Sequence, residues 1–217
     1  MKNYPETLST IEMAQLIRLR PAMYFGDDIT LTGLSNFLFG FNLNVRIKSI
    51  PPFEHFNVWL RRKLEIEHSS SMHWLHIILE KCNKDERKAF DIFYELLDEF
   101  ILVQPIQIIE TNLLESNFNF YYSKGVPSRY IGEKIIIEPA PYHIKLIKFD
   151  LYVWAYFFDF NYVAGESKKP IFYSNYRDFK TIKKAKNDFN KLFGHLEWLQ
   201  KEENQIISEF EGIIKNS

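Results

Sequence analysis

Apolar residues recur every three or four positions through most of the first hundred residues, which is the period of amphipathic helices. Five such stripes can be followed, near positions 13–17, 34–45, 53–64, 72–82 and 89–100. Ser9 and Glu12 have the spacing of a capping box, which predicts the start of the first helix. Pro21 predicts its end, because the residue before a proline is pushed out of the helical region. Since five such helices can bury their stripes against one another, we expect a helical subdomain over residues 1–102.

The stripe from Ala89 to Phe100 is the clearest of the five, and Asn83 with Glu86 predicts a cap at the start of its helix. Four acidic residues follow three- and four-residue spacing on the side opposite this stripe: Asp91, Glu95, Asp98 and Glu99. A solvated helix face is the commoner explanation of such a pattern. The functional alternative is a docking surface for a basic partner protein, because complementary charge speeds association.

The period changes after residue 102, where alternating and β-prone segments predict strands. The predicted strands cover residues 102–109, 118–122, 134–138, 142–148 and 151–160, and residues 164–167 read as a hairpin loop that returns through 171–173. His143 and Lys145 alternate with apolar residues, which predicts one wet face of an antiparallel sheet. Residues 151–160 are apolar on both faces, so we expect that strand inside the sheet rather than at its edge.

Helical spacing returns after Asp178 and extends to Leu199, with Gly194 as a predicted kink or break. A last apolar stripe runs from Ile206 to Ile214. The predicted fold class is therefore α+β, with an N-terminal helical subdomain over residues 1–102, followed over 103–217 by a small antiparallel sheet with C-terminal helices. One continuous domain is the alternative.

Composition narrows the class of function. The net charge is -1, from 27 Lys and Arg against 28 Asp and Glu, so no basic excess suggests a nucleic-acid partner. The densest basic group is Lys180, Lys183, Lys184, Lys186 and Lys191, which fits the wet face of a helix. No signal peptide precedes residue 20, and no run approaches the ~20 apolar residues of a membrane span. We expect a cytoplasmic protein without a membrane partner.

Cys82 is the only cysteine, so an internal disulfide and a Cys/His zinc cluster are both excluded. Its place on an apolar stripe predicts a small buried side chain.

Residues 20–26 (Arg-Pro-Ala-Met-Tyr-Phe-Gly) resemble a segment near the start of the ATPase domain of type II topoisomerases. That family binds ATP with an acidic residue and an asparagine on the following helix and with glycine-rich loops. Here no acidic residue occurs between Thr30 and Pro52, and the chain has only 8 glycines. We interpret the segment as a local turn in which Met23 and Tyr24 fill the core and Gly26 takes a turn geometry.

A metal centre would use His73 and His76, which are three residues apart. His68, Glu67 or Glu80 would be its third ligand. The zinc-protease pattern His-Glu-x-x-His is absent, so the two histidines are weak candidates and we expect no metal and no cofactor.

Two other enzyme classes have little support. A nuclease centre needs clustered carboxylates with a nearby lysine. The only approximation to it is Glu133, Glu138 and Lys145, and Pro139 and Pro141 interrupt their spacing. Nucleophile-elbow and phosphate-loop patterns are absent. We therefore expect no catalytic residues.

The first hundred residues resemble an uncharacterised family of bacterial proteins encoded beside secreted or polymorphic toxins. The matching positions are Ile17, Arg20-Pro21-x-Met23-Tyr24-x-Gly26, Phe53, Phe56-x-x-Trp59-Leu60, Ser71-x-x-Trp74-x-x-Ile77-Ile78, Asp85-Glu86, Ala89-Phe90, Phe93 and Leu96-Leu97-Asp98-Glu99-Phe100. Ala22 departs from the glycine that is usual after the proline. The resemblance implies an immunity protein.

The sequence thus favours a non-catalytic binding protein that neutralises a cognate bacterial toxin by direct contact, with Asp91, Glu95, Asp98 and Glu99 as the predicted partner-binding residues. Two alternatives stay open. One is a metal-dependent enzyme of unknown substrate that uses His73 and His76. The other is a homo-oligomeric regulatory protein assembled through residues 206–214.

Overall fold

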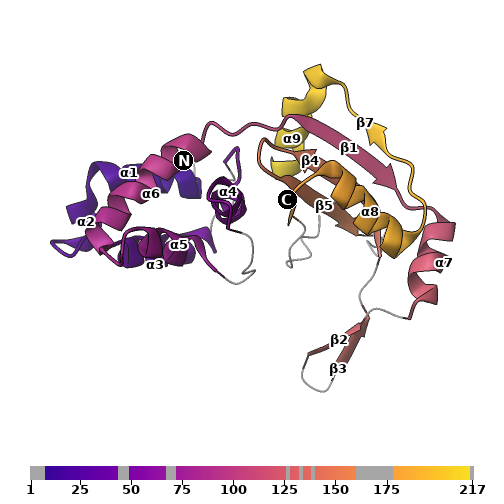
Figure 1. The fold of residues 1–217 in the computed structure, drawn as a ribbon, viewed down its shortest axis with the longest axis horizontal. Helices are drawn as coiled ribbons and strands as arrows, with labels where there is room; N and C mark the ends of the chain where they lie inside the picture. The colour runs from indigo at the N-terminus through magenta and orange to yellow at the C-terminus, as the bar shows by residue number, and fades with distance from the viewer. Residues whose placement is uncertain are drawn as a thin grey trace, which may run out of the picture. The chain divides into compact units, whose positions relative to one another are not determined.

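The structure is a computed structural model, and it describes residues 8–43, 49–66, 72–125, 128–131, 134–137, 140–159 and 178–215. The chain divides into two compact units, Met1–Gln104 and Pro105–Ser217 (Figure 1). The first is helical, and the second combines an antiparallel sheet with helices. The α+β fold class predicted from the sequence is confirmed.

The helical unit contains all five predicted amphipathic helices. Its elements are α1 (Thr10–Leu19), α2 (Pro21–Phe25), α3 (Leu31–Asn42), the 3-10 turn η1 (Phe53–His55), α4 (Phe56–Lys63), α5 (Trp74–Lys81) and α6 (Glu86–Phe100). The capping box of α1 is confirmed. The Ser9 hydroxyl accepts from the Glu12 N–H at 3.3 Å, and the Glu12 carboxylate accepts from the Ser9 N–H at 2.7 Å.

Local details around α1, α2 and α6 differ from the sequence prediction. Pro21 ends α1 but also begins α2, because a proline lacks only an N–H that the first helical turn leaves unpaired. Met23 is 74% exposed, so its predicted place in the core is wrong. The cap of α6 is Asp85, whose carboxylate accepts from the Lys88 N–H at 3.0 Å. Asn83 instead has a φ of 52° in the preceding turn.

The second unit is built on a five-stranded sheet with the order β6-β5-β4-β1-β7, in which every neighbouring pair is antiparallel. The strands are β1 (Gln107–Asn112), β4 (Pro141–Lys148), β5 (Val153–Asp159), β6 (Asp178–Phe179) and β7 (Leu199–Gln200). β5 lies between β6 and β4, as its two apolar faces predicted. A separate pair joins β2 (Ser128–Ile131) and β3 (Lys134–Ile137). The predicted hairpin at 164–173 lies outside the described residues.

The predicted strand at 118–122 is wrong, since these residues belong to the helix α7 (Glu115–Ser123). The buried side chain of Asn117 explains the difference. Its Oδ1 accepts from the Leu114 N–H at 2.9 Å, which closes the first turn of the helix. Its Nδ2 donates to the carbonyls of Phe193 at 2.8 Å and His195 at 3.0 Å, which ties α7 to the chain around Gly194.

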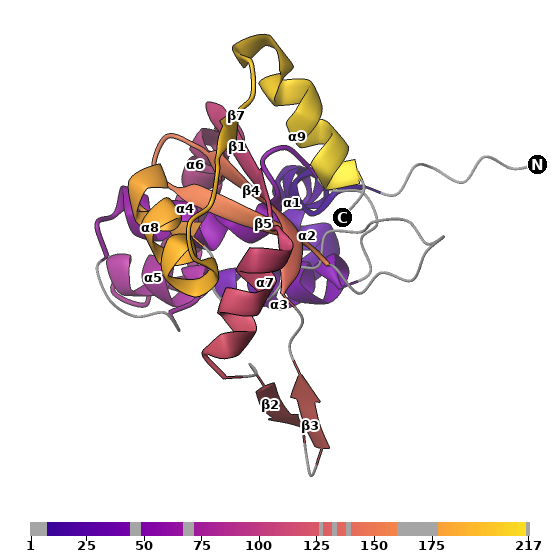
Figure 2. The same cartoon turned by 90° about the vertical axis from the view of Figure 1, so that its right-hand side faces the viewer.

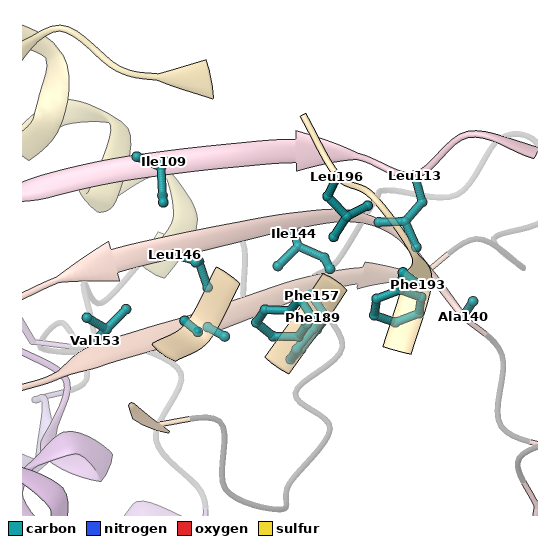
Figure 3. Packing of buried hydrophobic residues seen from close by; sticks show 12 residues of the cluster. Ile109, Leu113, Ala140, Ile144, Leu146, Val153, Phe157, Phe189, Phe193 and Leu196 are labelled. Carbon is teal, nitrogen blue, oxygen red and sulfur yellow. The ribbon is translucent and has the colours of Figure 1, made fainter. Parts of the chain in front are cut away.

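Helix α8 (Ile182–Phe193) covers one face of the sheet (Figures 1 and 3). Phe189 and Phe193 pack there against buried residues of β4 and β5, among them Ile144 and Phe157. Gly194 ends the helix with a φ of 79°, which confirms the predicted break. The helix does not continue to Leu199, because that residue pairs with β1 as part of β7.

Helix α9 (Ile206–Lys215) covers the opposite face (Figure 2). The ring centroid of Phe210 lies 5.4 Å from that of Phe149 and 6.3 Å from that of Tyr156. Ile206, Ile213 and Ile214 are buried as well. Four of the five apolar residues of this stripe are therefore covered within the chain, while Ile207 is 53% exposed.

Two further predictions concern the burial of Cys82 and the absence of a membrane-spanning helix. Cys82 is 3% exposed, as its apolar position predicted, and burial raises the pKa of its thiol. Among the described residues, no helix is both long enough and apolar enough to cross a membrane.

Candidate functional site

The acidic side of α6 divides into an exposed pair and a neutralised pair. Asp91 and Glu95 are one helical turn apart and exposed, and neither carboxylate forms an ion pair or hydrogen bond with a described residue. We name these two residues the exposed acidic pair. Asp98 and Glu99, one turn further on, both bind cationic side chains of the same unit, and we name them the neutralised pair. The structure therefore keeps two of the four predicted partner-binding carboxylates unpaired.

The neutralised pair contributes to the packing of the helical unit. The Arg18 guanidinium of α1 donates from Nη1 to both oxygens of Asp98, at 2.7 and 2.8 Å, and lies 5.2 Å from the ring centroid of Tyr94. The Tyr94 hydroxyl donates to the Ala14 carbonyl at 2.8 Å, which fixes α1 against α6. The Lys63 ammonium of α4 pairs with Glu99.

Large apolar side chains also stand exposed on α1 and α2 of this unit. Leu16 and Leu19 are three residues apart on α1 and are 41% and 76% exposed, and Met23 of α2 is 74% exposed. Single exposed apolar residues are ordinary, whereas a group of them is typical of a contact surface for another protein. Since α1 packs directly against α6, charged and apolar side chains are available on neighbouring helices.

The two histidines proposed as metal ligands lie at the start of α5. His73 is the N-cap residue rather than part of the helix, and its Nδ1 accepts from the Leu75 N–H at 3.4 Å. Its ring packs against Trp74, at 5.0 Å between centroids; burial lowers the pKa of His73, and the nearby His76 lowers it further. His68 and Glu67 lie outside the described residues. Within the part of the chain that is described, no group of three His, Cys, Asp or Glu side chains lies close enough to hold a metal ion.

His73 also lines a pocket of about 190 Å³ inside the helical unit, together with Ser35, Asn42, Glu54 and Asn57. This volume is below the range of about 300–1,000 Å³ that is typical of small-molecule sites.

The second unit contains a group of charged side chains that the sequence analysis did not bring together. We name it the sheet charge cluster; it consists of Glu110, His143, Lys145, Lys201 and Glu209. Glu110 is central: its carboxylate lies 2.7 Å from the Lys201 ammonium, 3.3 Å from that of Lys145 and 3.4 Å from His143 Nε2. The contact with His143 lacks hydrogen-bond geometry. Lys145 pairs in addition with Glu209 of α9.

The pKa shifts show which ions the cluster favours. Burial alone would raise the pKa of Glu110, but the hydrogen bond from Lys201 and the nearby Lys145 outweigh it and hold that pKa below its ordinary value of 4.5. Burial lowers the pKa of His143, against the opposing effect of Glu110. At neutral pH two carboxylates therefore face two ammonium groups around a neutral imidazole. Such a balanced group is suited to holding α9 and β7 on the sheet.

Part of this cluster was accessible to sequence reasoning. Alternation placed His143 and Lys145 on the wet face of their strand. The register of β1 and β4, in which Glu110 lies opposite Lys145, was not foreseen, because the predicted first strand ended at residue 109. Glu133 and Glu138, which the nuclease alternative combined with Lys145, lie outside the described residues.

No protein-family model, curated protein or solved structure matches this chain.

Proposed function

We propose that this chain is a binding protein that neutralises a cognate bacterial toxin by direct protein–protein contact, through the helical unit. The observation that carries the proposal is the exposed acidic pair on α6. Asp91 and Glu95 present two charges to solvent, whereas Asp98 and Glu99 are already neutralised within the unit. The resemblance of the first hundred residues to proteins encoded beside toxins points in the same direction.

The chemistry of this surface suggests a basic partner. Many toxins that act on nucleic acids are basic at their active sites, because they bind phosphate. An acidic surface speeds association with such a partner, and apolar side chains such as Leu19 and Met23 supply buried area. A stable complex buries on the order of 1,600 Å², so the exposed acidic pair forms only part of the interface.

Reversing the charge of the exposed acidic pair, as Asp91→Lys with Glu95→Lys, is expected to slow association with the toxin about tenfold or more at low salt. The probe is the C-terminal domain of a secreted protein encoded next to this chain, tested for binding rate and for growth arrest when the two are co-expressed. The expected difference shrinks as salt is added, because salt screens exposed charges. Asp98 is left intact, since its reversal would also break the pair with Arg18.

The matched control is Asp27→Lys with Glu80→Lys, which changes the net charge equally at two exposed positions of the same unit. We expect it to alter the association rate less than about twofold. Equal slowing in both variants would assign the effect to net charge alone. Unchanged binding in the first variant would place the interface away from α6, and failure of the full chain to bind or protect would contradict the proposed function.

A further inference from the structure

A pocket of about 420 Å³ lies within the second unit, where α8 begins beside the start of β1 and the end of β4. Gln107 and Ile109 of β1 and Gln200 of β7 form part of its lining, and the amide of Gln107 donates to that of Gln200 at 2.8 Å. The pocket differs from the exposed acidic pair in both place and charge. Its volume falls within the range of about 300–1,000 Å³ that is typical of small-molecule sites.

Four lysines line this pocket: Lys148, Lys180, Lys183 and Lys186. None of its described lining residues is acidic. Lys148 and Lys183 have no ion pair with any described residue, and the Lys186 ammonium lies 5.7 Å from the ring centroid of Trp198. The pocket therefore concentrates positive charge, and the ammonium groups of Lys148 and Lys183 are not neutralised by a described carboxylate.

Two lysines of the basic group between residues 180 and 191 lie outside this pocket. Lys184 and Lys191 both lie near the carboxylate of Asp188, at 3.2 and 3.8 Å. Neither lines the pocket. The basic run read from the sequence as one wet helix face is thus divided into a pair bound to Asp188 and a group around the pocket.

The start of α8 adds hydrogen-bond donors to this charge. The Thr181 hydroxyl accepts from the Lys184 N–H at 3.1 Å, while the N–H groups of the first residues have no acceptor within the helix. The positive end of the helix dipole lies at the same place, and it favours bound anions. Ile109, Ile182 and Trp198 supply an apolar wall beside the lysines.

We propose that this pocket binds a small molecule through its phosphate groups. Several ammonium groups in one pocket match the charge of a di- or triphosphate, and Lys is a common point-charge ligand of phosphate. The apolar wall at Trp198 offers a surface for a base or another ring attached to the phosphates. This site lies in the unit that the proposed function does not use, so either proposal can fail without the other.

The test is calorimetric titration of the full chain with ATP and, separately, with inorganic pyrophosphate. The double variant Lys183→Gln, Lys186→Gln is expected to weaken binding by about tenfold or more, because it removes two ammonium groups from the pocket. The matched variant Lys184→Gln, Lys191→Gln loses the same charge outside the pocket. We expect its affinity for either probe to change by less than about twofold. Thermal unfolding of each variant verifies that it is folded.

The two probes distinguish the sources of the phosphate. Tighter binding of ATP than of pyrophosphate supports a nucleotide whose base contacts the Trp198 wall, and equal binding supports recognition of the phosphates alone. The proposal is overturned if neither probe binds at about 5 mM. Equal weakening in both double variants, or binding of a single-stranded oligonucleotide with no binding of either probe, overturns it as well.

Discussion

Replacing Phe56 with alanine is expected to lower the free energy of unfolding of the helical unit by about 3–5 kcal/mol, the usual cost of removing a fully buried aromatic ring. Phe56 is 0% exposed. Its ring centroid lies 5.3 to 5.9 Å from the centroids of five other rings, those of Phe53, Trp59, Trp74, Phe93 and Phe100. The variant leaves a cavity between η1, α4, α5 and α6 that these rigid side chains cannot fill.

Hydrogen exchange followed by mass spectrometry gives the measurement for this unit alone, on peptides from α6. Since each 1.4 kcal/mol is a factor of ten, the slowest amides are expected to exchange about a hundredfold to a few thousandfold faster. Phe39→Ala is the control, because Phe39 is 66% exposed in the same unit and its loss is expected to cost within about 0.5 kcal/mol. Similar exchange in the two variants would show that Phe56 is not central to this core.

The position of Phe56 illustrates what the sequence alone could establish. Its stripe repeats at helical spacing, so the pattern identified both the helix and its buried side. The same reasoning located α1, α3, α5 and α6. Strands β4 and β5 were found because alternation of side chains is equally local information.

The errors arose where a contact distant in the sequence decides the local structure. Residues 118–122 are aromatic and β-prone, yet the hydrogen bonds of Asn117 to Phe193 and His195 favour a helix there. Leu199 continues the helical spacing of α8, but pairing with β1 takes it into a strand. Propensity is a weak prior that tertiary contacts override.

In the candidate sites, too, the sequence pattern predicted local features, and contacts between distant residues decided the rest. The exposure of Asp91 and Glu95 followed from helical spacing alone. The pairing of Asp98 with Arg18 depends on how α1 packs on α6, and sequence spacing carries no such information. Three of the four lysines around the pocket at the start of α8 belong to the basic group recognised in the sequence, whereas Lys148 was not recognised. Only the fold separates Lys183 and Lys186 from the pair at Asp188.

The sheet charge cluster, which no linear pattern revealed, leads to the second large expected effect. Glu110→Gln is expected to lower the free energy of unfolding of the second unit by about 2–3 kcal/mol at pH 7. The variant removes the negative charge between Lys145 and Lys201, both of which are partly buried, and leaves the Lys201 ammonium with a neutral amide in place of its 2.7 Å carboxylate partner. We place the cost below that of a fully buried pair, because the Lys201 side chain is 29% exposed and retains some water.

The stability lost in Glu110→Gln is expected to depend on pH. The fold holds the pKa of Glu110 below its ordinary value of 4.5, so the stabilisation is complete above pH 4.5 and is lost as the pH falls through the lower folded value. The difference in the free energy of unfolding between the wild-type chain and Glu110→Gln, measured by urea unfolding, should therefore narrow steadily below pH 4.5. Glu197→Gln makes the same chemical change at an exposed position, and it should leave stability nearly unchanged throughout. A difference between the wild-type chain and Glu110→Gln that stays constant into acid would mean that Glu110 stabilises the sheet by its packing, and that the ions around it contribute little.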